Sequence, residues 1–266
     1  MDKAFLKWAG GKSQSLDFLL ENIGEVKGKF IEPFVGSGVV ALNIGAPCII
    51  GDYNLDLINL YKTLKEDDTF IEGLRAYFSG EFNNSESFYS LRAKFNNSSS
   101  REERSALFVY LNRHCFNGLC RYNKSGGFNV PFGKYKTVHF PEKELLKFKH
   151  KLSEWDILHN SYEETIKLAT PEDVIYNDPP YVPLSLTSYF TDYSVGGFTE
   201  EQQRSLAHLA ERSECRVLIS NHDTEFTREI YKNANCIKTK GVNRFISAKA
   251  GGRKIIHELL AIYDKK

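Results

Sequence analysis

The sequence of 266 residues has no long hydrophobic run, no paired-cysteine motif and no internal repeat. Without an apolar stretch of about 20 residues the chain is not expected to span a membrane, and its first residues lack the apolar core of a secretory signal. The five cysteines form an odd set without a Cys-x-x-Cys pair, which favours reduced thiols in a cytoplasmic protein over disulfides or a metal site. Hydrophobic residues at 41% and charged residues at 26% are typical of a globular protein.

Acidic residues are absent from two long tracts, although the net charge of the whole chain is only +1. Residues 105–141 and residues 230–257 contain Lys and Arg but no Asp or Glu. Such clustering favours one basic face on a near-neutral protein, and nucleic acid is therefore a candidate partner. The alternative is a pair of basic loops that only face solvent.

Short apolar runs that alternate with helical patterns predict an α/β fold. The segment between the second and third expected strands is mostly helical, and Ser125-Gly126-Gly127 near its end predicts a β-hairpin turn. We therefore expect a sheet domain, residues 1–54 and 153–266, interrupted by a helical domain, residues 55–152. The expected strands are residues 29–31, 48–51, 155–158, 173–177 and 216–220, followed by a terminal pair at residues 236–240 and 255–263.

The tetrapeptide Asp178-Pro179-Pro180-Tyr181 follows one of the expected strands. The exocyclic amine of a nucleobase is a weak nucleophile, so its methylation requires acceptors that hold both N–H groups. Asp178 offers a carboxylate for this task, the Pro179 carbonyl lies on a restricted backbone, and Tyr181 offers a flat ring for an extruded base. The alternative is an Asp-Pro turn followed by a buried tyrosine.

Two glycine motifs are candidates for a nucleotide site. Gly11-Lys12-Ser13 matches only the end of a phosphate-binding loop, because Leu6 stands where the leading glycine is required. Gly36-x-Gly38-x-x-Ala41 fits the loose dinucleotide pattern, with Asp52 placed for a ribose hydroxyl, and nicotinamide, flavin and S-adenosylmethionine sites share that pattern. Glu32 before it favours S-adenosylmethionine, because a carboxylate suits a cationic ligand better than a pyrophosphate.

Residues 5–12, 32–38, 112–135 and 178–181 together resemble the Dam-type, GATC-modifying DNA adenine methyltransferases. The resemblance covers almost the whole chain and the order of the motifs. It implies a doubly wound, Rossmann-like methyltransferase sheet with a mostly helical target-recognition insertion that bears a β-hairpin. It also implies S-adenosyl-L-methionine as cofactor, double-stranded DNA as partner, and a monomeric, nucleoid-associated cytoplasmic enzyme without a metal.

The resemblance and the residue patterns together give three sets of candidate site residues. The catalytic set is Asp178, Pro179, Pro180 and Tyr181. The cofactor-binding set is Trp8, Lys12, Glu32, Phe34, Gly36, Gly38, Asp52 and Asp178. The DNA-binding set is Lys7, Phe116, Asn117, Leu119, Arg121, Asn129, Pro131 and Tyr135.

The chain departs from the family pattern at two places. Phe116 stands where the family favours a tyrosine that wedges into the duplex, and a phenylalanine can still stack there. Residues 242–245 are less basic than the corresponding family segment. Arg121 suits the two major-groove acceptors of guanine, with a phosphate contact as the alternative.

We expect a site-specific DNA adenine N6-methyltransferase that flips its target base. The nearest alternatives are an RNA or protein-glutamine methyltransferase, whose tetrapeptide usually has Asn in place of Asp178, and a catalytically silent DNA-binding module. The long insertion favours duplex reading, and the intact carboxylate favours catalysis. A role in mismatch repair, in a phage or in restriction–modification stays open at this point.

Overall fold

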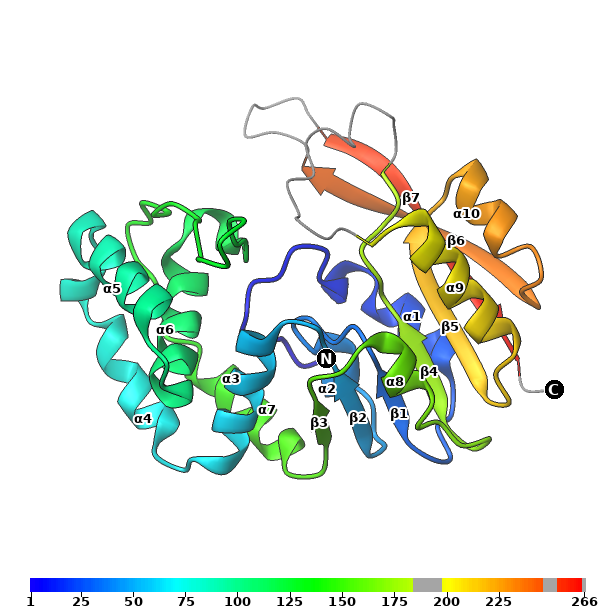
Figure 1. Ribbon diagram of the computed structural model, residues 1–266, viewed down its shortest axis with the longest axis horizontal. Helices are drawn as coiled ribbons and strands as arrows, with labels where there is room; N and C mark the ends of the chain where they lie inside the picture. The colour runs from blue at the N-terminus through cyan, green and yellow to red at the C-terminus, as the bar shows by residue number, and fades with distance from the viewer. Residues whose placement is uncertain (184–197, 246–252, 265–266) are drawn as a thin grey trace. The chain divides into compact units, whose positions relative to one another are not determined.

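The computed structural model describes residues 1–183, 198–245 and 253–264. Within them, seven strands form one sheet in the order β3-β2-β1-β4-β5-β7-β6 (Figure 1). β4 is parallel to β1 and β5, whereas β7 is antiparallel to β5 and β6. The strands are β1 (Phe30–Glu32), β2 (Cys48–Gly51), β3 (Asp156–Leu158), β4 (Val174–Asn177), β5 (Arg216–His222), β6 (Cys236–Phe245) and β7 (Arg253–Tyr263). The predicted α/β class is confirmed.

Several helices begin where the sequence supplies a capping side chain. Asn54 caps α3 by accepting from Leu57 N, and Ser100 caps α6 in the same way. The α-helices are α1 (Leu16–Ile23), α2 (Val39–Leu42), α3 (Leu55–Glu66), α4 (Phe70–Arg75), α5 (Ser85–Asn97), α6 (Arg101–His114), α7 (Glu142–Leu152), α8 (Tyr162–Ile166), α9 (Glu200–Glu211) and α10 (Glu225–Ile230). Short 3₁₀ turns are η1 (Lys12–Gln14), η2 (Ala76–Phe78), η3 (Gly80–Phe82) and η4 (Phe116–Gly118).

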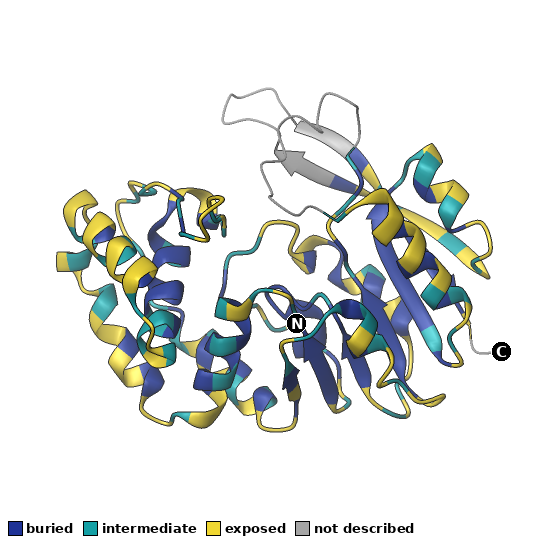
Figure 2. Ribbon diagram, viewed as in Figure 1, coloured by how far each residue is buried: buried dark blue, intermediate teal, exposed yellow. Residues whose placement is uncertain are grey.

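The central strands are buried along their whole length. Every residue of β1, β2 and β4 is buried, as the dark blue strands of Figure 2 show. Parallel strands covered on both faces have continuous apolar sequences, and that is why these segments lack the alternation of a half-exposed strand. The helical insertion has an aromatic core of its own, which includes the fully buried rings of Phe88, Phe95 and Phe108.

The segment between β2 and β3 carries α3 to α7 and the predicted hairpin turn. Asn123 N donates to Gly127 O at 2.8 Å, and Gly126 takes the left-handed φ of +77° that the turn requires. The flanking residues form only isolated bridges, Tyr122 with Phe128 and Cys115 with Phe132. The turn is therefore present, but its arms form no continuous ladder: Asn129 N donates to Arg121 O at 3.1 Å, while Phe128 N bonds to Asn96 of α5.

One detail of the sequence-based assignment was wrong. The terminal strands are longer than expected, since β6 continues to Phe245 and β7 starts at Arg253. The added residues of β6 and β7 pair with each other, for example Phe245 with Arg253. Backbone pairing between the two strands therefore continues beyond the apolar segments from which they were predicted.

The chain divides into two compact units, each defined by its own internal contacts. Unit 1 comprises residues 1–13, 35–43 and 50–160, and unit 2 comprises residues 14–34, 44–49 and 161–266 as far as they are described. The helical insertion thus lies in unit 1 together with the amino-terminal segment and the glycine loop. The functional division into residues 1–54 with 153–266 and residues 55–152 stays a prediction.

Candidate active site and DNA-binding residues

Two carboxylates stand at the ends of neighbouring strands in unit 2. Glu32 is the last residue of β1, and Asp178 follows directly on β4. The two strands pair in parallel, with Ile31 opposite Ile175, so their carboxyl ends lie at the same edge of the sheet. The strand order changes direction between β1 and β4, which is where open α/β sheets bind their ligands. Glu32 is buried, at 3% exposure, and a cationic ligand would stabilise its charge.

The tetrapeptide backbone is held by polar side chains from α9 and β5. Gln203 Nε2 donates to Pro180 O at 2.8 Å, and Val182 N donates to Asn221 Oδ1 at 3.1 Å. His222 Nδ1 lies 2.6 Å from Val182 O, so that ring nitrogen carries the proton in this bond. Gln203, Asn221 and His222 are all buried. The segment that follows Asp178 is therefore fixed on both sides, which is what a group that orients a substrate requires.

These three supporting residues were missed as site residues in the sequence. Gln203 lies within an ordinary amphipathic helix, and nothing in its local sequence distinguishes it. Asn221 and His222 carry a usable signal, because polar residues end the apolar run of β5 at its carboxyl end. Asn221 Nδ2 also donates to Gln203 Oε1 at 3.0 Å, so the three residues form one connected group.

Tyr181 keeps a partly exposed ring next to this group. Its ring meets the His222 imidazole edge to face, with centroids 4.9 Å apart at 76°. Burial, together with the charge of Asp178, raises the pKa of the Tyr181 phenol. The same two causes raise the pKa of Tyr176, whose hydroxyl shares a 2.9 Å hydrogen bond with Ser220 Oγ. Both phenols stay protonated at neutral pH and add no negative charge beside the carboxylate.

Phe34 belongs to an aromatic cluster in unit 2. Its ring stacks on Tyr162 with centroids 5.4 Å apart at 22°, and Phe198 meets it edge to face at 5.6 Å. Phe34 is only half-buried. A flat, partly exposed aromatic surface of this kind is suited to contact a purine ring.

The glycine loop of unit 1 is tight because a tryptophan packs on it. Gly36 has a φ of +47°, and a Cβ atom there would lie 2.6 Å from Trp8 Nε1. Gly38 has a φ of +67°, and a Cβ atom there would lie 2.7 Å from Phe148 Cζ. Both positions therefore require glycine for conformation and for space. The Gly36 carbonyl is fixed by the Tyr61 hydroxyl at 2.5 Å.

Asp52 closes this loop from the end of β2. Its Oδ2 accepts from Gly36 N at 3.0 Å, and its Oδ1 accepts from Asn54 N at 2.9 Å. Burial raises the pKa of the Asp52 carboxyl above its usual range, while the two N–H donors oppose that shift. A hydroxyl donor from a ligand would add a further hydrogen bond to this desolvated carboxylate. Lys12, also predicted for the cofactor, is buried and donates to Gly10 O at 2.7 Å.

Several of the predicted DNA-binding residues lie together in unit 1. The Lys7 ammonium lies 4.2 Å from the centre of the Tyr135 ring, and Asn117 N donates to the Tyr135 hydroxyl at 2.9 Å. Burial and the nearby charge of Arg113 lower the pKa of Lys7. Phe116, next in sequence, is 47% exposed although it is large and apolar. An exposed aromatic ring is suited to stack on a base of a nucleic acid.

Arg121 and Asn129 face each other on the two arms of the hairpin turn. Arg121 is exposed, and its Nε donates to Asn129 Oδ1 at 2.8 Å. Of the remaining predicted residues, Pro131 is exposed and Leu119 is half-buried. The roles of these residues in reading the DNA sequence stay predictions.

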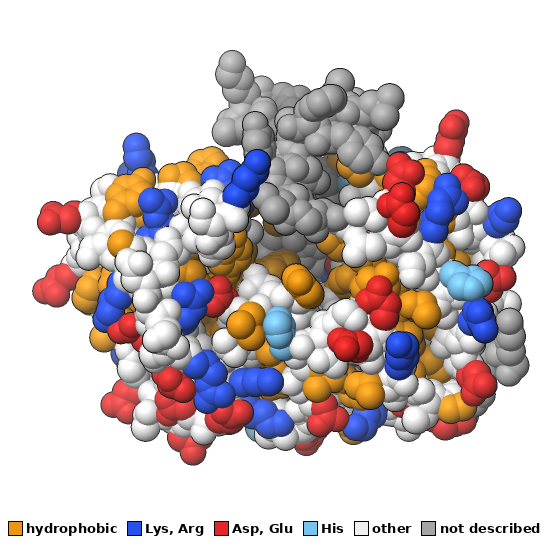
Figure 3. All heavy atoms as spheres, viewed as in Figure 1, with side chains coloured by type: hydrophobic (Ala, Val, Ile, Leu, Met, Phe, Trp, Pro, Cys, Tyr) orange, Lys and Arg blue, Asp and Glu red, His pale blue; other side chains and the backbone are white. Residues whose placement is uncertain are grey.

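The predicted basic face is only partly visible in the structure. On the face shown in Figure 3, Lys and Arg side chains lie among Asp and Glu side chains, and the described residues there form no continuous basic surface. Arg113 does not belong to such a face: it is half-buried and donates to Phe5 O at 3.3 Å. Residues 246–252 of the second acid-free tract lie outside the described residues.

The described part of the chain contains no cluster of His, Cys, Asp or Glu suited to a metal ion. Its helices are also too short or too polar for any of them to cross a bilayer. These two findings concern only residues 1–183, 198–245 and 253–264.

The fold defines the class as an α/β protein with carboxylates at the carboxyl ends of two central parallel strands, and comparison with known proteins specifies the family. Residues 8–244 match the family described as D12 class N6 adenine-specific DNA methyltransferase. The chain is 47% identical over 270 residues to the DNA adenine methylase of Serratia marcescens, which covers 98% of each chain. It is 46% identical over 268 residues to the DNA adenine methylase of Escherichia coli K12, covering 98% of this chain and 95% of the relative. The Vibrio cholerae DNA adenine methylase is 45% identical over 267 residues, covering 98% and 96%.

The chain belongs to the D12 class of N6 adenine-specific DNA methyltransferases. It is an adenine-specific DNA methyltransferase, and the prediction of the family and of the reaction is confirmed. Family membership implies S-adenosylmethionine as the methyl donor and DNA as the substrate.

Proposed function

We propose that this enzyme methylates adenine N6 in GATC sites of duplex DNA, after flipping the adenine out of the helix. The observation that carries the catalytic part is the position of Asp178 after β4, beside the end of β1 where Glu32 stands. GATC specificity is proposed from the resemblance of the motifs to the Dam-type DNA adenine methyltransferases.

Asp178 and Pro179 perform the central step in this proposal. The Asp178 carboxylate accepts from one N–H of the adenine amine, and the Pro179 carbonyl accepts from the other, which frees the nitrogen lone pair from the ring. Tyr181 stacks on the flipped base and keeps its plane fixed. The amine nitrogen bonds to the methyl carbon while the carbon–sulfur bond breaks, and the extra proton leaves through Asp178. The support is the buried group of Gln203, Asn221 and His222 behind this loop.

S-Adenosylmethionine supplies an electrophilic methyl group. The proposed cofactor residues fit its chemistry, because Glu32 suits its cationic end, Asp52 its ribose hydroxyls and Phe34 its adenine ring. Trp8, Gly36 and Gly38 build the tight loop, and we assign them to the same site together with Lys12.

For duplex binding we propose the hairpin and the surface around η4. Arg121 reads a guanine through its two major-groove acceptors, with Asn117 and Asn129 available to other base edges. Phe116 fills the space beside the flipped adenine. The remaining predicted contacts, Lys7, Leu119, Pro131 and Tyr135, position the backbone of the DNA.

Direct sequencing of modified bases tests the reaction and its site together. DNA from methylation-deficient cells that express this chain should carry N6-methyladenine at GATC, and DNA from cells that express Asp178→Ala should not. Methyl transfer to RNA or to protein glutamine, in place of duplex DNA, would favour the alternative enzymes. Tight duplex binding with no transfer to any substrate would indicate a catalytically silent module.

Calorimetry tests the cofactor assignment separately. Asp52→Ala should weaken S-adenosylmethionine binding by about 1–3 kcal/mol, because the ribose loses a hydrogen bond to a charged group. Asp68→Ala is the matched control, since the Asp68 side chain is 96% exposed and pairs with Lys149 at the surface. NADH binding tighter than that of S-adenosylmethionine would contradict the assignment.

A further inference from the structure

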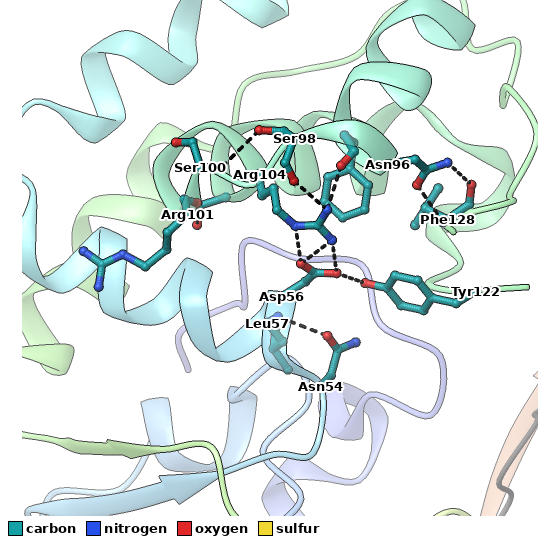
Figure 4. Close-up of polar contacts among 12 residues, drawn as sticks. Asn54, Asp56, Leu57, Asn96, Ser98, Ser100, Arg101, Arg104, Tyr122 and Phe128 are labelled. Carbon is teal, nitrogen blue, oxygen red and sulfur yellow. Dashed lines mark hydrogen bonds and ion pairs between the residues drawn. The ribbon is translucent and has the colours of Figure 1, made fainter. Parts of the chain in front are cut away.

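The two arms of the hairpin are attached to unit 1 in different ways. The returning arm is packed: the Phe128 ring meets Phe95 with centroids 6.0 Å apart, and Val130 is fully buried. Asn96 of α5 holds the same arm by its backbone, accepting from Phe128 N at 2.8 Å and donating to Phe128 O at 3.2 Å. These bonds lie at the right of Figure 4. Packing and backbone bonds therefore fix this arm to α5.

The outgoing arm, which carries Arg121, is attached by a polar group at α3. The Tyr122 hydroxyl donates to Asp56 Oδ2 at 2.8 Å (Figure 4). Arg104 holds the same carboxylate with three hydrogen bonds of 2.7 to 2.9 Å. Arg104 is itself fixed, since its Nη1 donates to Phe95 O at 2.8 Å. Asp56 is a mostly buried anchor, with its side chain 11% exposed.

Asp56 lies four residues after Asp52 in the sequence. The segment that connects them contacts the glycine loop and the hairpin. Asp52 Oδ1 accepts from Asn54 N, and Asn54 Oδ1 in turn caps α3 by accepting from Leu57 N at 3.2 Å. The side-chain amide of Asn54 also lies 3.7 Å from Cys120 Sγ, on the outgoing hairpin arm. Residues 52–56 therefore bond to the glycine loop at one end and to the hairpin at the other.

Close packing does not fill the space along this segment. A pocket of about 710 Å³, open to solvent, is lined by residues that include Asp52, Asp56, Ser98, Arg104 and Tyr122. Where side chains are packed, their van der Waals contacts fix the distance between two elements. Beside an open pocket, a few hydrogen bonds fix that distance instead. On the outgoing arm, the bond from the Tyr122 hydroxyl to Asp56 is the best suited to fix the distance to α3. Its acceptor is a side chain that three hydrogen bonds from Arg104 already orient.

We propose that Asp56 is a positioning residue that couples cofactor binding at Asp52 to DNA reading by the hairpin. A ligand held by Asp52 fixes residues 52–56, and Asp56 then fixes Tyr122 and with it the neighbouring Arg121. Coupling of this kind is reciprocal, so a duplex read by Arg121 strengthens cofactor binding by the same factor. The inference rests on the proposed roles of Asp52 and Arg121.

Tyr122→Phe tests the coupling, because it removes one hydroxyl and keeps the ring beside Phe128. The measurement is the dissociation constant of S-adenosylhomocysteine, which cannot donate a methyl group, with and without a short duplex that contains one GATC site. For the wild-type enzyme we expect the duplex to tighten binding by about fivefold or more, within the usual range of coupling factors. For Tyr122→Phe we expect that ratio to fall below about twofold while binding without DNA is unchanged. Tyr89→Phe is the matched control, since Tyr89 is an exposed tyrosine of α5 outside the hairpin.

The outcomes separate a coupling role from a structural one. A lower melting temperature for Tyr122→Phe with an unchanged ratio would overturn the proposal, because the hydroxyl would then only stabilise the fold. A wild-type ratio near one would overturn it as well. Failure of the wild-type enzyme to transfer a methyl group to any duplex would instead reject the proposed function itself, and the inference with it.

Discussion

The loop that follows β4 and the hairpin of unit 1 are held in opposite ways. The backbone of residues 180–182 is bonded by three buried side chains, Gln203, Asn221 and His222. In the hairpin, by contrast, Arg121, Asn123 and Lys124 are exposed, and Tyr122 with Phe128 forms an isolated bridge. The chemical step needs acceptors in one fixed geometry, whereas reading a duplex tolerates adjustment on contact. Substitutions in the loop after β4 should therefore change the methylation rate and the stability of the protein. Substitutions in the hairpin should change the selectivity for the DNA sequence.

Asp178→Ala should have the largest effect. Loss of the acceptor that orients the adenine amine should lower the methylation rate by roughly a hundredfold or more, as for other preorganised electrostatic groups. Duplex affinity should change little, because phosphate contacts lie elsewhere. Single-turnover kinetics measure the methylation rate, and a binding assay on the same duplex measures the affinity. Near-normal turnover in this variant would remove Asp178 from the mechanism.

Asn221→Ala should come next, because it removes the acceptor of a buried backbone N–H. Val182 N donates to Asn221 Oδ1, whereas Gln203 Oε1, which also bonds to Asn221, keeps a bond from the Tyr231 hydroxyl. We expect a loss of about 1–3 kcal/mol in the free energy of unfolding, which is the usual cost of removing the partner of one buried polar group. Asn233→Ala is the control, an exposed asparagine that should change stability by less than about 0.5 kcal/mol. Denaturant unfolding measures the stability of both variants. Equal stabilities of Asn221→Ala and Asn233→Ala would show that Asn221 does not hold the loop after β4.

His114 should make unit 1 sensitive to acid. Burial lowers its pKa from 6.5 to about 4, so between these values the unfolded chain binds a proton that the folded chain does not. Stability should therefore fall as the pH drops from 6.5, by about 2.5 kcal/mol at pH 4.5 if the unfolded value is 6.5. His114→Phe keeps a ring at the stacking position 4.1 Å from Tyr110 and should flatten this part of the profile. An unchanged slope in His114→Phe, with the exposed His139→Phe as control, would assign the acid sensitivity to another group.

Arg121→Ala should give the smallest change in overall activity and the most selective one. If Arg121 reads guanine, the variant should lose about 1–3 kcal/mol of discrimination against sites altered at one guanine, with an almost unchanged salt slope. Lys124→Ala, on the exposed turn, should weaken all duplexes alike and lower the salt slope by about one unit. Methylation rates on singly substituted sites at two salt concentrations separate the two cases. A uniform drop for Arg121→Ala would mean that it contacts a phosphate.

The sequence by itself determined the elements and motifs that depend on near neighbours. Apolar runs placed β1, β2 and β4 within a residue or two, because strands buried on both faces need continuous apolar side chains. The tetrapeptide after β4 and the glycine loop were visible for a related reason: restricted backbone angles require proline or glycine at fixed positions. The family and its reaction were predicted from the resemblance of these motifs, and of their order, to a known family.

Only the tertiary structure decided which distant residues support them. Gln203, Asn221 and His222 meet the loop after Asp178 through contacts across 23 to 40 positions of sequence, and no local pattern encodes such pairs. The same holds for Asp56 with Arg104 and Tyr122, and for the burial of Arg113, which the sequence placed on a basic face. Polar side chains bond to whichever partner the fold brings within about 3 Å, so their partners are a property of the folded chain and not of the neighbouring residues.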